Sequence, residues 1–137
     1  MGKPVIARCH GNVFGGGLGL AMACDFRVAS DGARFCTPFV KLALAGCDMS
    51  AGYFLPRLIG LGRATDMMMT ARIVEAGEAL AIGLVTQITP EDRLDAAVEE
   101  LAGRLAAGAP TTTAFTKSAI RKSLDSRRTV IAEILAA

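Results

Sequence analysis

Three consecutive glycines, Gly15, Gly16 and Gly17, constrain the fold of this chain more than any other feature of its sequence. They follow residues 3–9, KPVIARC, where a proline and then β-branched apolar residues predict a buried strand. They precede residues 18–24, which are almost all apolar or small and predict a helix buried on every side. The glycines therefore form a strand-to-helix turn whose backbone N–H groups point outward with no side chain in the way.

The glycine turn lacks the marks of three familiar motifs. A Walker loop closes with Gly-Lys-Ser or Gly-Lys-Thr, but this run closes with Gly-Leu-Gly. A dinucleotide fingerprint starting at Gly15 would need a glycine where Leu20 stands. The G-x-S-x-G of serine hydrolases is approached only by DMSAG, which begins with Asp48. Two roles remain for the glycine run. Its N–H groups could bind a phosphate or a developing oxyanion, or the glycines could serve only the close packing of the helix on the strand.

Local patterns predict further elements after the turn. Residues 25–30 alternate as a strand does, and a helix is expected to begin near Ala51 with Ser50 or Asp48 as its N-cap. From Thr89 onward the chain is expected to be helical, with Thr89 as N-cap and Pro90 at the first helical position. The remaining predicted elements are helices over residues 63–70 and 75–82, a strand over residues 84–88, an apolar helical stripe of Leu94, Ala97, Val98, Leu101 and Leu105, and a helix after Pro110.

The composition excludes several classes of protein. Of the 137 residues 52% are hydrophobic, yet no apolar run approaches the about 20 residues that span a membrane. The net charge of +2 disfavours nucleic-acid binding, and one histidine with four widely spaced cysteines disfavours a metal site. Without a signal-peptide core, the sequence predicts a cytoplasmic protein with reduced thiols and no membrane contact.

Two longer stretches carry a family resemblance. KPVIARCHGNVFGGGLGLAMACDFRVASDGARF, residues 3–35, resembles the signature of the crotonase superfamily, the enoyl-CoA hydratase/isomerase family. LPRLIGLGRATDMMMTARIVEAGEALAIGLV, residues 55–85, is similar to the stretch that follows in the same proteins. The resemblance implies an α/β, crotonase-like (ClpP/crotonase) fold, of which we expect only the C-terminal half. Residues 1–88 would be a fragment of the spiral β-β-α core, and residues 89–137 a helical trimerisation region.

The resemblance also implies roles for the glycine turn. Its middle glycine, Gly16, would supply one N–H of an oxyanion hole that grips an acyl-CoA thioester carbonyl, while the second N–H would come from a loop that we expect to precede this chain. Gly15, Gly17 and Phe39 are the implied substrate contacts. The family's hydratases carry two glutamates, at the positions where this chain has Gly19 and Phe39. Neither residue moves a proton, so hydration by that pair is disfavoured.

One acid remains at a position that resembles a catalytic one. Asp48 stands seven residues before Leu-Pro-Arg, where dienoyl-CoA isomerases carry a catalytic aspartate and chlorobenzoyl-CoA dehalogenases an aspartate nucleophile. A carboxylate there could shuttle a proton, although a helix N-cap is an equally good role for Asp48. We therefore expect isomerase-like proton transfer on an acyl-CoA thioester in a homotrimer or hexamer, with no cofactor beyond the substrate's coenzyme A. The alternative is a catalytically inactive, truncated or assembly-only chain.

Overall fold

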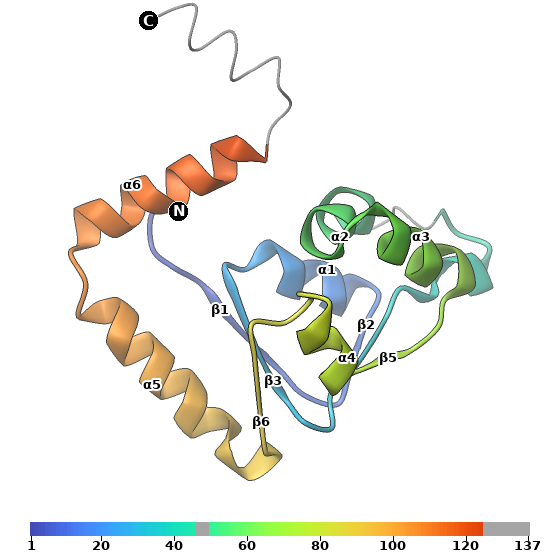
Figure 1. The fold of residues 1–137 in the computed structure, drawn as a ribbon, viewed down its shortest axis with the longest axis horizontal. Helices are drawn as coiled ribbons and strands as arrows, with labels where there is room; N and C mark the ends of the chain where they lie inside the picture. The colour runs from blue at the N-terminus through green and yellow to red at the C-terminus, as the bar shows by residue number, and fades with distance from the viewer. Residues whose placement is uncertain (46–49, 125–137) are drawn as a thin grey trace, which may run out of the picture. The chain divides into compact units, whose positions relative to one another are not determined.

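The computed structural model describes residues 1–45 and 50–124 of the chain (Figure 1). Two compact units divide it: Val5–Ala102 forms the larger, and Met1–Pro4 with the segment from Gly103 onward forms the smaller. The division falls inside α5 (Leu94–Ala106). Two residues of the predicted stripe on this helix, Leu94 and Leu101, are buried, which confirms its apolar face.

The larger unit contains a three-stranded parallel sheet. In it β3 (Phe26–Ser30) lies between β1 (Ile6–Cys9) and β6 (Gln87–Thr89), and both pairings are parallel. Because parallel neighbours need a crossover, the chain between β1 and β3 leaves the sheet and returns through α1 (Gly16–Ala23). Figure 1 shows β1, β3 and β6 side by side. The predicted strand, turn, helix and strand of the first 30 residues are confirmed.

A second, smaller sheet lies beside the glycine turn and was missed by the sequence patterns. Its middle strand, β4 (Arg34–Cys36), pairs in parallel with β2 (Asn12–Phe14) and antiparallel with β5 (Val74–Glu75). These strands are two or three residues long, too short for an alternating pattern to stand out. Their pairing places the end of β2, and with it Gly15, against the end of β4.

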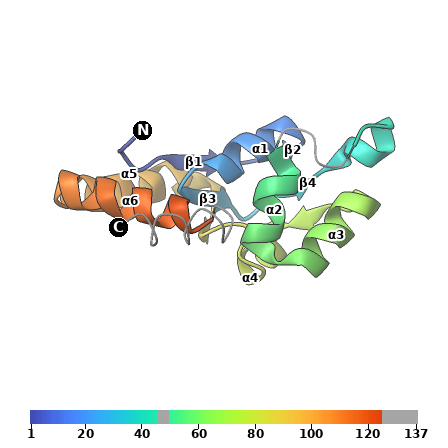
Figure 2. The same cartoon turned by 90° about the horizontal axis from the view of Figure 1, so that it is seen from above.

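Short helices complete the larger unit. Figure 2 shows α2 between α1 and α3. Gly60 and Gly62 predict a break between α2 and α3, and the structure confirms it at Gly60, whose φ of 87° is a left-handed conformation that glycine adopts without strain. The bounds are α2 (Ala51–Ile59), α3 (Leu61–Thr70), α4 (Ala76–Ala81) and the 3-10 helices η1 (Pro38–Leu42) and η3 (Glu91–Arg93).

The prediction that the helix after the glycines is buried on every side was wrong. Leu18 and Met22, one turn apart on α1, are buried in the core, but Leu20 on the opposite side is 72% exposed. A sequence of uniformly apolar residues cannot mark which side faces the core, because amphipathic contrast is the signal that does so. The core around α1 draws on both sheets and on α2 and α3.

The predicted start of the C-terminal helical part was also wrong. Thr89 is the last residue of β6, where its carbonyl oxygen accepts the Asp31 N–H at 2.8 Å, and it does not cap a helix. Pro90 stands at the N-cap of η3, one residue ahead of the predicted position, and α5 begins only at Leu94. The strand predicted over residues 84–88 was also misplaced: β6 begins three residues later, at Gln87, and its pairing with β3 carries it to Thr89.

The cap of α2 differs from expectation as well. Ser50 occupies the N-cap position with a φ of 66°, and its side chain makes no capping hydrogen bond. The other predicted cap, Asp48, lies outside the described residues. The smaller unit contains α6 (Pro110–Ser123), which begins with proline at its first turn as predicted. Across residues 1–45 and 50–124, no helix combines the length and the apolar character needed to cross a lipid bilayer.

Candidate functional site

The glycine turn has a backbone geometry that depends on Gly15. This residue has a φ of 55° and a ψ of −122°, a combination that side chains rarely allow. Its N–H donates to the carbonyl oxygen of Cys36 at 3.0 Å, and its own carbonyl oxygen accepts the N–H of Gly19 at 3.0 Å. Both sides of Gly15 are therefore held, one by β4 and the other by the first turn of α1.

This geometry aims the N–H of Gly16 away from the helix. The bond between Gly15 and Gly16 is trans, as are all peptide bonds of the described chain, so its C=O and N–H point in opposite directions. Since the C=O of Gly15 points into α1, the N–H of Gly16 points out of its N-terminus. Gly16 and Gly17 are both exposed, and their N–H groups precede the first hydrogen bond of the helix. Such donors suit a negatively charged oxygen.

Phe39 lies against this turn. Its ring carbons Cε1 and Cζ are 3.8 Å from the place that a Cβ on Gly15 would take, and the Cδ of Pro38 is 3.9 Å from it. Phe39 is 6% exposed and belongs to the hydrophobic core, so its ring is directed inward from η1. The structure thus brings together four residues that the sequence singled out: Gly15, Gly16, Gly17 and Phe39.

The positions of the two absent glutamates are both buried. Gly19 lies on the buried side of α1, one turn after Gly15, and Phe39 fills the other position with a ring. Asp48, the proposed proton carrier, lies outside the described residues, as does Cys47. Asp25, which ends the ACD of the family-like stretch, has a structural role, because its Oδ2 accepts the N–H of Val5 at 2.8 Å.

Two further polar side chains, His10 and Lys117, are candidates for a role. A structural hydrogen bond is expected of His10, but this residue is exposed and no hydrogen bond joins it to another described residue. Lys117, a possible phosphate contact by the resemblance, donates from Nζ to the carbonyl oxygen of Lys3 at 2.8 Å, inside the smaller unit. This bond ties residues 1–4 to α6, a contact between chain ends that no sequence pattern signals.

The described cysteines behave as packed thiols. Cys9 and Cys36 are buried and Cys24 is half-buried, and none of the three forms a disulfide. Burial raises the pKa of the Cys9 thiol to about 11, against the opposing attraction of Arg27. Burial also raises the pKa of Cys36, whose Sγ donates to the carbonyl oxygen of Ala71 at 3.2 Å. A raised pKa leaves little thiolate at neutral pH, which disfavours nucleophilic chemistry at these positions.

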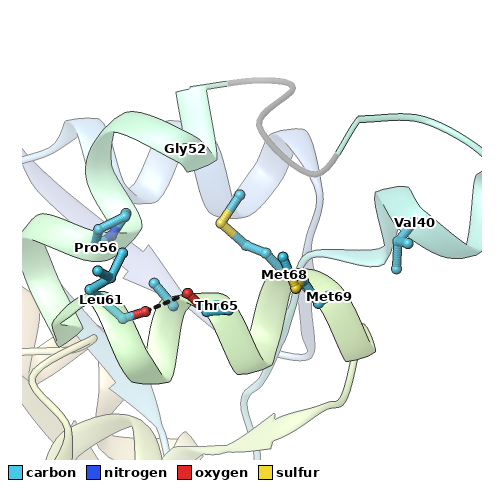
Figure 3. A pocket seen from close by; sticks show the side chains of 8 residues that line it. Val40, Gly52, Pro56, Leu61, Thr65, Met68 and Met69 are labelled. Atoms are coloured by element: carbon cyan, nitrogen blue, oxygen red, sulfur yellow. Dashed lines mark hydrogen bonds between the residues drawn. The ribbon is translucent and has the colours of Figure 1, made fainter.

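A shallow apolar cavity of about 310 Å³ lies between η1, α2 and α3 (Figure 3). Among the described residues that line it, Thr65 alone carries a hydroxyl, which donates to the carbonyl oxygen of Leu61 at 2.8 Å. The described part of the lining therefore offers mainly apolar contact. Its lining residues are Val40, Gly52, Pro56, Leu61, Ala64, Thr65, Met68 and Met69. Nowhere in residues 1–45 and 50–124 do three His, Cys, Asp or Glu side chains gather as metal ligands.

Comparison with known proteins supplies the family. The model of the enoyl-CoA hydratase/isomerase family matches residues 1–135. Short-chain-enoyl-CoA hydratase of Clostridium acetobutylicum is 38% identical over 122 residues, which are 89% of this chain and 46% of that protein. The structure of enoyl-CoA hydratase/isomerase from Cupriavidus metallidurans CH34 is similar with a TM-score of 0.87 at 38% identity, covering 98% of this chain and 51% of that one. A monofunctional enoyl CoA isomerase from M. smegmatis has a TM-score of 0.85 at 38% identity, covering 92% and 59%.

These similarities have two consequences. The chain spans about half the length of the curated relatives that it matches. It nevertheless matches them over most of its own residues, and the solved structures share its α/β crotonase-like fold. A family match that runs over nearly the whole chain, on a fold that the solved relatives share, establishes that this protein belongs to the enoyl-CoA hydratase/isomerase family.

Proposed function

We propose that the glycine turn of this chain binds the carbonyl oxygen of an acyl-CoA thioester and that the chemistry is enolate-type proton transfer, isomerase-like rather than hydration. The observation that carries the proposal is the exposed N–H of Gly16, aimed out of α1 by the held peptide of Gly15. When a proton leaves the carbon beside a thioester, negative charge develops on the carbonyl oxygen. A preorganised N–H donor stabilises that charge by a few kcal/mol, about 2.7–4 in a measured case.

Isomerisation fits the surroundings of the turn better than hydration does. Adding water to a double bond needs groups that activate the water and protonate the adjacent carbon. Gly19 has no side chain, and Phe39 presents a hydrocarbon ring at the second position. Moving a proton within the acyl chain needs only one carrier, for which we propose Asp48. The alternative role, N-cap of α2, falls at Ser50 in the structure and not at Asp48. The proposed reaction uses no metal or redox group, and coenzyme A takes part as a portion of the substrate.

We further propose that the chain corresponds to the later half of the family fold, with residues 1–88 as part of the spiral core and residues 89–137 as an assembly region. The length shared with the relatives and the order of the motifs support this. In that case the second oxyanion donor comes from a segment that precedes these residues in the family's order. The cytoplasmic location remains a prediction.

A second candidate, a chain that serves assembly and not catalysis, has its own observation. Phe115 and Ile120 on α6 are 72% and 57% exposed, and in the larger unit Leu61 and Met69 are 74% and 73% exposed. Large apolar side chains exposed to this extent mark surfaces that associate. A homotrimer or hexamer would bury them, with or without activity at the glycine turn.

The two candidates are separated by binding and exchange measurements on the purified chain. We expect calorimetric titration with a short-chain 3-enoyl-CoA to show binding, and NMR in D2O to show exchange of the protons on the carbon beside the thioester. Absence of binding would contradict the proposed function and favour the assembly role. Binding without exchange would leave the turn as a binding site and contradict the proton transfer.

Matched variants at Gly16 test the donor itself. Gly16→Pro removes the N–H at a first helical position that proline occupies well, whereas Gly16→Ala adds a Cβ and keeps the N–H. We expect the proline variant to exchange protons about 10²- to 10³-fold more slowly than the alanine variant. Equal rates in the two variants would rule out the N–H of Gly16 as the donor. Asp48→Ala should abolish exchange at an unchanged melting temperature, and a lowered melting temperature with retained exchange would identify a structural role.

A further inference from the structure

The direction of the Gly16 N–H depends on a single peptide plane. Gly15 has no Cβ and stands at a φ of 55°, so little in its own covalent structure keeps the peptide in one orientation. Two hydrogen bonds hold it, from its N–H to Cys36 and from Gly19 to its carbonyl oxygen, each at 3.0 Å. If either bond opens transiently, the freedom of a glycine lets its peptide rotate, so packing beside the residue adds a restraint to the two bonds.

The packing comes from Phe39. The edge of its ring lies 3.8 Å from the Cβ position of Gly15, an ordinary van der Waals distance, on a side that a Cβ would otherwise occupy. The ring is 6% exposed and packs in the core that contains Leu18 of α1. Phe39 therefore borders the space beside Gly15 on the side where a Cβ would point, at the distance of an ordinary van der Waals contact from that position.

The backbone that carries Phe39 is itself fixed. Thr37, fully buried ahead of η1, donates from Oγ1 to the carbonyl oxygen of Met67 at 3.2 Å, which ties the start of η1 to α3. On the other side, the N–H of Leu44 donates to the carbonyl oxygen of Phe39 at 2.9 Å. The backbone on either side of the ring is thus fixed, by α3 through Thr37 and by the turn that ends at Leu44.

We propose that Phe39 is a positioning residue, whose ring holds the Gly15 peptide so that the N–H of Gly16 keeps its outward direction. The proposal rests on the proposed function for its catalytic consequence, but its structural part stands on the described contacts alone. It also gives the aromatic ring a role at the position where the family's hydratases carry a glutamate. A carboxylate in this buried place could not pack against Gly15 and would be desolvated.

Amide hydrogen exchange tests the structural part without any substrate. In Phe39→Ala we expect the Gly15 N–H to exchange at least about tenfold faster than in the wild type, beyond any change in the most protected core amides. Phe26→Ala is the matched control, because it removes a half-buried ring from β3 and should leave Gly15 exchange unchanged relative to the core. If Phe39→Ala does not fold, Phe39→Leu replaces it, with a smaller increase expected. Equal relative exchange of Gly15 in the Phe39 and Phe26 variants would overturn the proposal.

Separate measurement of the exchange rate and of the dissociation constant tests the catalytic consequence of the proposal. With a bound enoyl-CoA, Phe39→Leu should slow proton exchange at saturation by about tenfold while the dissociation constant changes little, because a misdirected donor affects the developing charge more than the ground state. An equal loss in Phe26→Leu would contradict positioning by Phe39. A wild type that binds no thioester would contradict the proposed function instead, and the Gly15 exchange measurement would still decide whether Phe39 holds the turn.

Discussion

Asp25 and Val5 hold the starts of two neighbouring strands together. The Oδ2 of Asp25 accepts the N–H of Val5 at 2.8 Å, and the carbonyl oxygen of Val5 accepts the N–H of Asp25 at 2.9 Å and that of Phe26 at 3.1 Å. These bonds set the register in which Ile6 faces Phe26 in the parallel pair of β1 and β3. The end of α1 is thereby fastened to the beginning of the sheet.

Removing the Asp25 carboxylate should destabilise the fold. Asp25→Ala leaves the half-buried N–H of Val5 without its acceptor, and we expect a loss of about 1–3 kcal/mol in the free energy of unfolding. Urea denaturation followed by circular dichroism measures this loss. Asp31→Ala, at an exposed side chain, should change the stability by less than about 0.5 kcal/mol. Equal effects at the two positions would show that the bond to Val5 contributes nothing.

Arg72 makes stability depend on pH through Glu78. Its two terminal nitrogens donate to the Glu78 carboxylate at 3.1 and 2.7 Å, and its Nε pairs with Asp66. The hydrogen bonds from Arg72 are the main cause that lowers the pKa of Glu78 below its ordinary value of 4.5. A carboxylate with a lowered folded pKa stabilises the fold above its unfolded pKa, and this contribution is lost as the pH falls through the lowered value.

The corresponding variant is Glu78→Gln. Because the side chains are partly exposed and screened by solvent, we expect a loss of at most about 1 kcal/mol at neutral pH, shrinking toward zero in acid and at high salt. Urea unfolding at several pH values measures the difference from the wild type. Glu99→Gln, on the exposed surface of α5, serves as the control with no such trend. A difference that persisted in acid would contradict the ion pair as its source.

The thiols should react in the order of their exposure. Burial raises the pKa of Cys9 to about 11, so near pH 8 only a very small fraction of this thiol is ionised in the folded protein. Among Cys9, Cys24 and Cys36, we expect iodoacetamide to modify Cys24 first, with peptide mass spectrometry as the readout. In urea all three should react alike. Modification of Cys9 as fast as Cys24 without urea would show that its burial is not maintained in solution.

The exposed apolar residues of α6 predict association. Light scattering on a size-exclusion column should show trimers or larger assemblies of the wild-type chain. Phe115→Asp, which places a charge on a 72% exposed apolar position, should shift the population toward monomers. Thr112→Asp, also exposed on α6, is the matched control for the added charge and should leave the assembly unchanged. A monodisperse wild-type monomer would contradict both the assembly region and the second candidate function.

Sequence reasoning succeeded where the constraint was local. The glycine run predicted a strand-to-helix turn because a left-handed residue and an open helix N-terminus are properties of a few consecutive residues, and Gly15 has that conformation. The helix break at Gly60 was predictable for the same reason. The resemblance then supplied what no local rule contains, a role for Gly16, and the candidate Asp48 rests on it alone.

Sequence reasoning failed where the outcome depended on distant partners. Thr89 reads as an N-cap by itself, but its pairing with Ser30 makes it the end of a strand. Uniformly apolar α1 gave no sign that Leu20 faces outward while Leu18 faces the core. For Thr89 the deciding contact joins residues that are far apart along the chain. For α1 the two faces of the helix have similar hydrophobicity, so the sequence does not show which of them packs on the core. Secondary-structure propensity encodes neither outcome.

The sequence by itself therefore determined the glycine turn and the identity of the residues around it, including Gly19 and Phe39 at the positions where the resemblance predicts hydratase glutamates, since these are matters of residue type and short spacing. Only the tertiary structure decided where Phe39 lies. Its ring reaches Gly15 because β2 pairs with β4 and because Thr37 ties η1 to Met67. These contacts join segments that are more than 20 residues apart in the sequence, and packing between such segments forms only when the whole core assembles.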